Sequence, residues 1–434
     1  MAARARPAAE RVVVTGLGVV APNALGAPAF AQALRAARSG LRAQKQLAEL
    51  GFVCQVAGVP EGVDERAAAL LPPDVLLASN GNHRYAALAA LEAWADAGLP
   101  GPEASDPAHV DWESGCVLGT GIGGMDTIAE RVVPLVDAGR ARRLGSTAVE
   151  QAMASGVSAR VGGLLGLGNQ VTTNSSACAT GCEAILMGAL RIRAGLAARM
   201  LCGGSEGASP HAWAGFDAMR VLARGWNAEP ERASRPCSAS ASGFVPAAGA
   251  GVLLLESLAS AQARGARIRA ELLGGAVNAG GQRGGGSMTA PNPAGVVRCI
   301  QAALADAGVA PGEVDAISGH LTATAADPRE VRAWACALGC APAALPPVVA
   351  TKALIGHALG AAGALECAAG VLMLEGGFLH AARNCEDLHP ELAPFAAALA
   401  RPEAQAHPIR LLAKAGFGFG DVNACLVFRR WDGA

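Results

Sequence analysis

The sequence predicts an α/β fold with largely buried sheets, and three observations lead to this expectation. Hydrophobic residues make up 52% of the 434 residues and charged residues only 16%, so much of the chain must be buried. Glycine numbers 56 and aromatic residues are scarce at 4%, and small residues let helices and strands approach closely. Short apolar runs alternate with helix-like stretches, which is typical of layered α/β proteins.

The first strand is expected at 11–15, which is a continuous β-branched run. A glycine turn is expected to follow it at 16–18. These glycines loosely fit a dinucleotide-binding fingerprint. Pro22 and Asn23 fall where the crossover helix should be established, however, which disfavours this alternative. Further strands are expected at 115–118, 199–202, 250–255, 267–273, 347–350 and 424–428.

Helical stretches separate the strands, and two segments look like connections. The helices are expected at 84–97, 183–196, 295–307 and 328–338. Residues 208–245 are rich in Pro, Ser, Trp and Arg, and residues 280–293 carry a glycine cluster. Both segments are therefore expected to form connecting caps rather than core elements.

Composition argues against several classes of function. The formal net charge of −1 gives no bulk reason to expect a nucleic-acid or membrane partner. The twelve cysteines include no Cys-x-x-Cys pair, so no metal site is expected and most should fill the core of a protein in a reducing cytoplasm. The apolar stretch 353–372 is interrupted by His357 and Glu366, and no signal peptide is convincing. We expect a soluble, cytoplasmic protein.

Cys178 is a candidate nucleophile, in the sequence Ser-Ala-Cys-Ala-Thr-Gly at 176–181. It follows a strand-like segment and precedes an apolar helix, whose N-terminus favours a thiolate and offers N–H groups to an oxyanion. A buried cysteine in an alanine-rich turn is an equally good interpretation of this segment alone.

His320 and His357 each lie in a strand-to-helix turn of the second half of the chain. Taken singly, each is more often a structural residue than a catalyst. Lys352 precedes His357 in an apolar stretch and needs a partner if it is buried, for which Glu366 is suited. A faint internal repeat suggests an active site between two halves of the chain. Residues 176–193 and 355–374 both place a reactive side chain just before a helix of small residues.

With these residues in place, the chain resembles the beta-ketoacyl-acyl carrier protein synthases of the elongating, Cys-His-His type. The resemblance covers nearly the whole chain, from RVVVTGLGVVAPN at the start to GFGFGDVNACLVF at the end, and includes TKALIGHALGAAGALE at 351–366. It implies a thiolase fold with duplicated αβ halves in an αβαβα five-layer sandwich. The halves are expected at 11–256 and 257–434, after a flexible tail at 1–10, and a homodimer is expected.

The resemblance also implies a role for each matching residue. Cys178 would take an acyl chain from acyl carrier protein, and malonyl-acyl carrier protein would lose carbon dioxide and attack the resulting thioester. His320 and His357 would donate hydrogen bonds to the malonyl thioester oxygen, Lys352 would orient His320, and Glu366 would hold Lys352. Phe419 would gate the site and share the oxyanion hole with Cys178. The expected substrate-binding residues are Ile122, Thr289, Thr322 and Thr324.

No cofactor of its own is expected, because the phosphopantetheine arm arrives on the carrier protein. Arg220 and Arg224 are candidates for carrier recognition, with a solvated face as the alternative. A non-catalytic heterodimer partner is the main alternative function, although such partners characteristically lack the cysteine. Thiolases, which use a second cysteine, and initiating synthases, which carry asparagine in place of His357, fit less well.

Two departures from the family pattern leave the pathway open between fatty-acid and polyketide-type elongation. The usual His-Gly-Thr-Ser-Thr contains Leu321 and Ala323 here, and the following acidic residues stand one position closer. The closing Gly-Phe-Gly-Gly carries Asp421 in place of its last glycine, where a carboxylate would restrict the swing of the loop.

Overall fold

The computed structural model describes residues 11–101 and 109–433, so the tail expected at 1–10 lies outside the described residues. Its main sheet consists of two five-strand arrays with the same pattern of directions. In each array two parallel pairings are followed by two antiparallel ones. The first array runs β6 (Val171–Thr172), β5 (Ser114–Gly119), β7 (Arg199–Glu206), β8 (Gly249–Ser257) and β1 (Val12–Ala21). The second runs β11 (Val348–Val349), β10 (Ala316–Ser318), β14 (Leu411–Gly418), β15 (Val422–Arg430) and β9 (Ala270–Ala279). The two arrays thus have the same arrangement of strands, which is the duplication that the faint internal repeat predicts.

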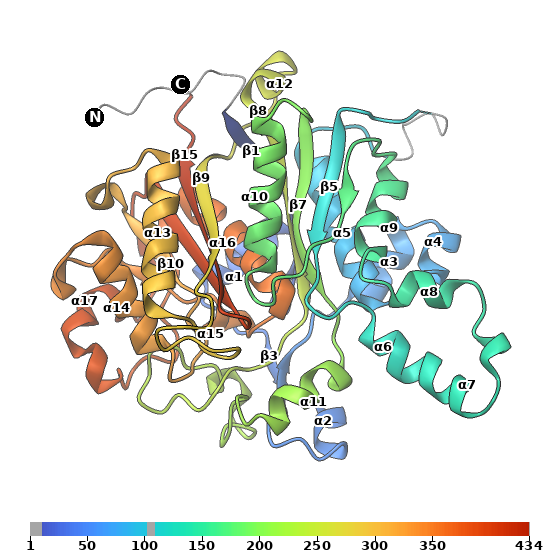
Figure 1. The fold of residues 1–434 in the computed structure, drawn as a ribbon, viewed down its shortest axis with the longest axis horizontal. Coiled ribbons are helices and arrows are strands. Elements are labelled where there is room, and N and C mark those ends of the chain that lie inside the picture. Colours follow the sequence, from blue (N-terminus) through green and yellow to red (C-terminus); the bar gives the residue numbers. More distant parts are fainter. Residues whose placement is uncertain (1–10, 102–108, 434) are drawn as a thin grey trace.

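Helices cover both outer faces of the sheet arrays and fill the space between them (Figure 1). Helices α5 (Gly81–Asp96) and α9 (Gly156–Leu165) pack on the first array, and α13 (Pro293–Ala307) packs on the second with α14 (Asp327–Leu338) beside it. Helices α10 (Thr180–Arg193) and α16 (Ala362–Gly376) contact strands of both arrays. The result is the αβαβα five-layer sandwich, which confirms the predicted fold class. The arrays join where Val12–Val14 of β1 pair with Ala270–Leu272 of β9.

The remaining elements are short and lie around this core. The helices are α1 (Ala27–Arg35), α2 (Lys45–Glu49), α3 (Val63–Leu70), α4 (Pro73–Leu77), α6 (Met125–Thr127), α7 (Val133–Asp137), α8 (Thr147–Ala152), α11 (Pro210–Ala218), α12 (Leu258–Ala263), α15 (Lys352–Ile355) and α17 (Ala396–Leu399). The strands are β2 (Ala24–Leu25), β3 (Leu41–Ala43), β4 (Val56–Gly58), β12 (Phe378–Leu379) and β13 (Gln405–Ala406).

The central helix α16 is buried along nearly its whole length. Thirteen of its fifteen residues are buried, and a Cβ on Gly363 would lie 2.7 Å from the Sγ atom of Cys182 on α10. The segment Leu359–Gly376 is long and apolar enough to cross a membrane, yet 89% of it is buried inside the protein. Its apolar character is thus explained by its place between the two arrays.

The glycine turn expected at 16–18 is wrong, because β1 continues to Ala21. Gly16 and Gly18 lie where α5 crosses the strand, and a Cβ on either would fall within 2 Å of a backbone oxygen, of Ala93 and Ala89 respectively. These glycines therefore permit close helix–strand packing rather than a turn.

Candidate active site

Cys178 lies in a tight turn that delivers it to the N-terminal end of α10. Ala177 before it has a φ of 48°, and the turn is held by Thr180. The Thr180 Oγ1 atom accepts a hydrogen bond from the Ser176 N–H at 2.7 Å and donates one to the Ala177 oxygen at 2.6 Å. Because Ala177 is held in this rarely populated backbone conformation, the orientation of the Cys178 thiol that follows it is fixed.

The fold brings Cys178 together with the two histidines of the second half. His320 lies just after the end of β10 and His357 just after the end of α15. One side-chain nitrogen of each histidine and the Cys178 sulfur all lie within 4.8 Å of one another. The two imidazole rings meet edge to face, with centroids 5.4 Å apart.

The hydrogen-bond partners of the histidines define their protonation. The Nδ1 atom of His357 accepts the N–H of Leu359 at 3.2 Å, so the ring proton of the neutral form lies on Nε2. The Nδ1 atom of His320 lies 3.3 Å from the Lys352 Nζ, which also donates to the His320 carbonyl at 2.7 Å. Burial, together with the charge of Lys352, holds the pKa of both histidines well below the usual value. Both rings are therefore neutral Nε2–H donors near neutral pH.

Lys352 and Glu366 form a buried ion pair behind His320. Their side chains are only 2% and 1% exposed, so water screens the pair weakly. The ammonium group faces the Nδ1 atom of His320 and thereby fixes which ring nitrogen carries the proton.

The Cys178 thiol differs from the thiolate that a helix N-terminus alone predicts. Burial raises its pKa to about 12, although Lys352 and a hydrogen bond from the Phe419 N–H act in the opposite direction. Cys178 is half-buried on the cavity wall, and desolvation of its sulfur outweighs the favourable charges. The resting sulfur therefore carries its proton.

Cys178, His320 and His357 line a cavity of about 430 Å³. Thr289, Thr322 and Thr324 lie on its wall, and the hydroxyl oxygens of Thr322 and Thr324 are 3.0 Å apart. Phe419 also lines it, with its ring 6.0 Å from that of Phe216. Ile122 is not on this wall. It packs in an adjacent cluster, and its N–H donates to Glu206 at 3.2 Å.

Two buried carboxylates hold the loop that carries His320. Glu330 accepts the N–H groups of His320 and Leu321, at 2.6 and 2.8 Å, and Asp327 accepts that of Thr322 at 2.9 Å. Burial raises the pKa of Glu330 to about 7. Leu321, one of the departures from the family pattern, is 2% exposed and packs in the core cluster of the second half. It fills space in the core rather than intruding into the cavity wall.

Models of two beta-ketoacyl synthase domains match the chain. The N-terminal domain matches residues 9–261 and the C-terminal domain matches residues 269–386. The chain belongs to the beta-ketoacyl synthase family. This assignment confirms the resemblance on which the sequence interpretation rests.

Individual relatives cover the synthase almost completely. The 3-oxoacyl-[acyl-carrier-protein] synthase 1 of Escherichia coli (strain K12) is 34% identical over 428 residues, which are 97% of this chain and 99% of that protein. The solved ishigamide ketosynthase/chain length factor has a TM-score of 0.86 at 31% identity, and the two chains are covered to 97% and 99%. A type II polyketide synthase acyl carrier protein in complex with its ketosynthase gives a TM-score of 0.84 at 29% identity, with the same coverage.

Asp421 ties the hairpin that carries Phe419 to the loop at 280–292. Its carboxylate accepts the N–H of Gln282 at 2.9 Å and that of Asn292 at 2.7 Å, while the Gly420 N–H donates to the Met288 oxygen at 2.8 Å. Asp421 is fully buried and has a φ of 62°. The restriction that the sequence analysis expected from this carboxylate thus has a specific form, which is a bridge between two loops of the cavity wall.

Glu206 is a buried residue of the synthase that received no role from the sequence. Its carboxylate accepts the N–H groups of Gly121 and Gly360, at 2.7 and 2.9 Å, and that of Ile122. Burial raises the pKa of this carboxyl. Glu206 therefore joins a loop of the first half to the turn that follows His357. The signal available in the sequence was an acidic residue at the end of an apolar strand.

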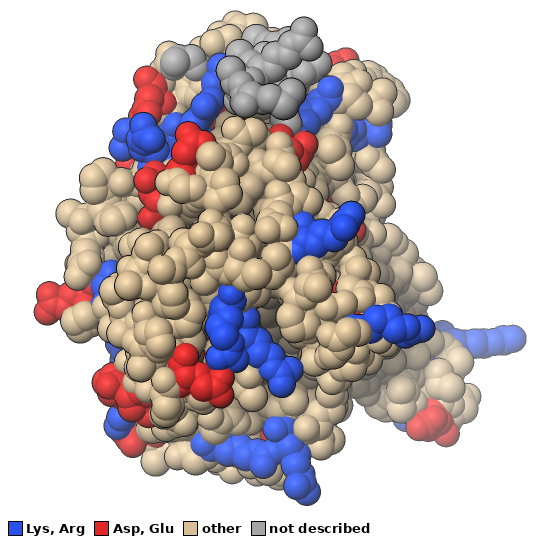
Figure 2. Space-filling view, turned by 60° about the vertical axis from the view of Figure 1, so that its left-hand side comes forward, with Lys and Arg blue, Asp and Glu red and all other residues tan. Residues whose placement is uncertain are grey.

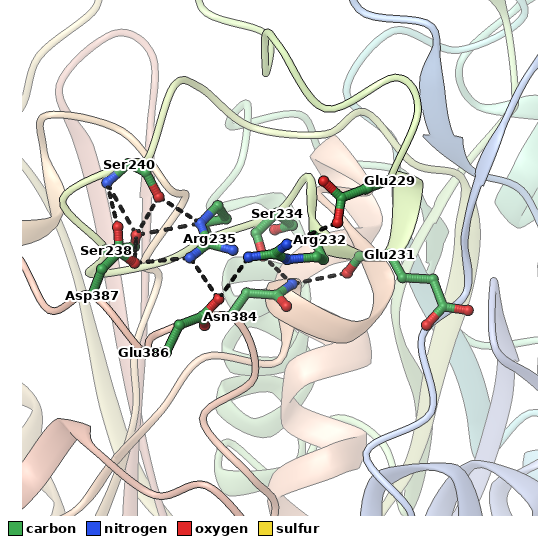
Figure 3. A network of polar contacts seen from close by, with 10 residues as sticks. All are labelled: Glu229, Glu231, Arg232, Ser234, Arg235, Ser238, Ser240, Asn384, Glu386 and Asp387. Carbon is green, nitrogen blue, oxygen red and sulfur yellow. Dashed lines mark hydrogen bonds and ion pairs between the residues drawn. The ribbon is translucent and has the colours of Figure 1, made fainter.

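A polar network around Arg235 anchors the cap segment beside the site (Figure 3). Arg235 is 2% exposed and donates to Glu386 at 2.9 Å and Asp387 at 2.8 Å, with its guanidinium 4.7 Å from the centre of the Trp226 ring. The neighbouring Ser234 hydroxyl donates to the Lys352 carbonyl at 2.8 Å. The network fixes the cap against the helix that carries Lys352.

Proposed function

We propose that the synthase catalyses the decarboxylating Claisen condensation of a Cys178-bound acyl chain with malonyl-acyl carrier protein, in fatty-acid or polyketide-type chain elongation. One observation carries this proposal. A sulfur nucleophile and two neutral imidazole N–H donors face a single cavity. The names of the relatives, which are acyl-carrier-protein synthases and ketosynthases, support the same chemistry.

In the first half-reaction the Cys178 sulfur attacks the thioester carbonyl of the acyl carrier protein. The new C–S bond forms as the C–S bond to the carrier breaks, and the proton of the Cys178 thiol ends on the carrier sulfur, which departs as a thiol. The N–H groups of Cys178 and Phe419 are proposed to hold the oxyanion. The Phe419 N–H already donates to the Cys178 sulfur, so it lies beside the position where the tetrahedral carbon must form.

In the second half-reaction the malonyl thioester loses carbon dioxide, and the electron pair of the broken C–C bond forms an enolate. The Nε2–H groups of His320 and His357 are proposed to stabilise the enolate oxygen. Neutral donors suit this role because they stabilise negative charge without releasing a proton that would quench the nucleophilic carbon. That carbon then attacks the acyl-Cys178 carbonyl and displaces the sulfur. Lys352 and Glu366 are assigned to keeping His320 in the donating form.

The phosphopantetheine arm of the carrier is proposed to enter along Thr289, Thr322 and Thr324. Arg329 is exposed and lines the mouth of the same cavity. Arg220 and Arg224 are exposed on the segment that also supplies Met219 and Val221 to the wall. Figure 2 shows basic side chains beside a hollow on one face of the molecule. Carrier proteins are usually acidic, so these arginines suit the docking of the carrier.

The test of the proposed function is condensation by Cys178→Ala with carrier-bound substrates. We expect no condensation product, because the acyl thioester cannot form. Cys336→Ala removes an exposed cysteine far along the chain from Cys178 and should leave the rate unchanged. Normal condensation by Cys178→Ala would refute the assignment, and condensation of coenzyme A substrates in preference to carrier-bound ones would contradict the proposed substrate.

We propose a homodimer that forms along the outer edge of β6. This strand ends the main sheet among the described residues, and apolar side chains around it are exposed, namely Trp112 (68%), Leu196 (58%) and Val171 (37%). Such a patch is typical of a protein interface. Size analysis of the pure, active protein tests this. Activity that requires a second, different chain would favour the heterodimer for which the ketosynthase/chain length factor is a precedent.

A further inference from the structure

Lys414 is a buried charge to which neither the sequence analysis nor the mechanism above gives a role. It lies on β14 with its side chain 0% exposed, and its Nζ atom is 2.8 Å from the Oε2 atom of Glu366. The two groups form an ion pair, and the Lys414 Nζ also donates a hydrogen bond to the carbonyl oxygen of Ala415. The other oxygen of Glu366 pairs with Lys352. A single carboxylate therefore lies between two ammonium groups.

Lys414 points toward the side of β14 that carries the nucleophile turn. Alternate residues of a strand share a face, so Lys414 lies on the same face as Gly416 and Gly418. A Cβ on Gly416 would lie 3.6 Å from the Cys178 oxygen, and one on Gly418 would lie 3.0 Å from the Cys178 nitrogen. The Lys414 side chain thus leaves β14 on the face that the Cys178 turn covers two and four residues further along the strand.

The cluster of Lys352, Glu366 and Lys414 holds more positive than negative charge. Burial lowers the pKa of Lys414, but the Glu366 carboxylate, followed by Cys182 and Cys367, acts in the opposite direction and raises the pKa above the usual value. Within these three side chains, two ammonium groups share one carboxylate. Both histidines feel the charge of Lys414, because it contributes to the lowering of their pKa values.

We propose that Lys414 is a positioning residue of the condensing site, which shares the Glu366 carboxylate with Lys352 and adds a second positive charge on the side of the site that holds His320, His357 and the Cys178 turn. This charge stabilises the negative charge that forms on the sulfur and on the enolate oxygen, and it keeps the two imidazoles neutral. The inference rests on the proposed function and extends it to a residue that contacts no substrate.

Several other titratable groups face Lys414 or feel its charge, and two of them, Cys182 and Glu330, would offset it when ionised. They are Cys182 on α10, Glu366 and Cys367 on α16, Glu330 on α14, Lys352 on α15, His320, His357, and Cys425 on β15. A hydrogen bond from Cys367 and the charge of Lys414 lower the pKa of the Cys182 thiol. A thiolate at Cys182 would cancel Lys414, whereas the proposal requires Cys182 to remain a thiol.

The test compares charge variants by two readouts that a purely structural role would not move. The first is the rate at which iodoacetamide alkylates Cys178 as a function of pH, and the second is the decarboxylation of malonyl-acyl carrier protein. Lys414→Met keeps the length of the side chain and removes its charge. We expect the alkylation rate at a fixed pH below the thiol pKa, and the decarboxylation rate, each to fall about tenfold.

The decisive comparison adds Glu366→Gln to Lys414→Met, with Glu366→Gln alone as control. The double variant regains the single excess positive charge through Lys352, so it should alkylate faster than Lys414→Met. A folded Lys414→Met variant with wild-type rates would overturn the proposal, as would a double variant no faster than the single one. Failure of both variants to fold would also overturn it, because Lys414 would then be a residue required for stability.

Cys182→Ala tests the charge balance directly. We expect an unchanged alkylation profile of Cys178, since a neutral thiol is replaced by a neutral methyl group. Faster alkylation would show that a Cys182 thiolate had been cancelling the charge of Lys414 and would contradict the proposal.

The wild-type protein separates this inference from the proposed function. If it does not condense carrier-bound substrates, the proposed function fails, whereas wild-type condensation with rates indifferent to Lys414 defeats only the inference.

Discussion

Replacing Asp421 should release the loop at 280–292 from the hairpin that carries Phe419. Asp421→Gly removes the carboxylate that accepts the N–H groups of Gln282 and Asn292, and glycine suits the positive φ at this position. Each hydrogen bond to a charged group contributes about 1.5 to 3 kcal/mol, so the pair contributes about 3 to 6 kcal/mol. Glycine adopts the left-handed backbone conformation of residue 421 without the strain that aspartate has there, which restores about 1 kcal/mol of stability. The net loss in the free energy of local opening is then about 2 to 5 kcal/mol.

Hydrogen exchange measures this loss at the two donors. Because about 1.4 kcal/mol corresponds to a factor of ten, protection of the Gln282 and Asn292 amides should fall by a factor of about 30 or more in Asp421→Gly. Asp421→Asn keeps one acceptor oxygen and tolerates the same φ, so it should retain part of the protection. Unchanged protection in Asp421→Gly would refute the bridge between the two loops.

Three further predictions concern pH, packing and the carrier. Burial lowers the pKa of His83 to about 4, below the value of 6.5 in the unfolded chain. As the pH falls, His83 is therefore protonated first in the unfolded state, and the folded protein loses stability below pH 6.5. Between pH 7 and pH 5 urea unfolding should show wild type losing about 2 kcal/mol more than His83→Gln, and an equal loss would contradict this. Leu321→Ala should lower the free energy of unfolding by about 2 to 5 kcal/mol, because Leu321 is 2% exposed, and a change below 1 kcal/mol would contradict its place in the core. Arg329→Glu should raise the KM for acyl carrier protein while leaving alkylation of Cys178 by iodoacetamide unchanged, and an unaltered KM would remove Arg329 from the docking surface.

The regular core could be predicted because its strands are apolar runs. The runs at 115–118, 199–202 and 250–255 lie within β5, β7 and β8, and the helix expected at 328–338 lies within α14. Strand β14 was missed for the opposite reason. Lys414 and the two glycines that follow it break the apolar run, and a lysine usually indicates a solvated face. Only the tertiary fold, which places Glu366 opposite it, makes a lysine stable there.

The reactive residues could be found from motifs, but their electrostatics could not. Local sequence places Cys178 before a helix, and this predicts a thiolate from the helix N-terminus alone. Desolvation depends on what the rest of the chain packs around the sulfur, and it reverses the prediction. Asp421 is a similar case, since its partners at 282 and 292 are more than a hundred residues away in sequence.

The most direct measurement of the central claim is the mass of the intact protein after incubation with acyl carrier protein loaded with an acyl chain. We predict an adduct of one acyl group on Cys178 that disappears when malonyl-acyl carrier protein is added, with release of carbon dioxide and a carrier-bound product two carbons longer. An acyl adduct on another residue, or an adduct on Cys178 that malonyl-acyl carrier protein does not discharge, would contradict the account.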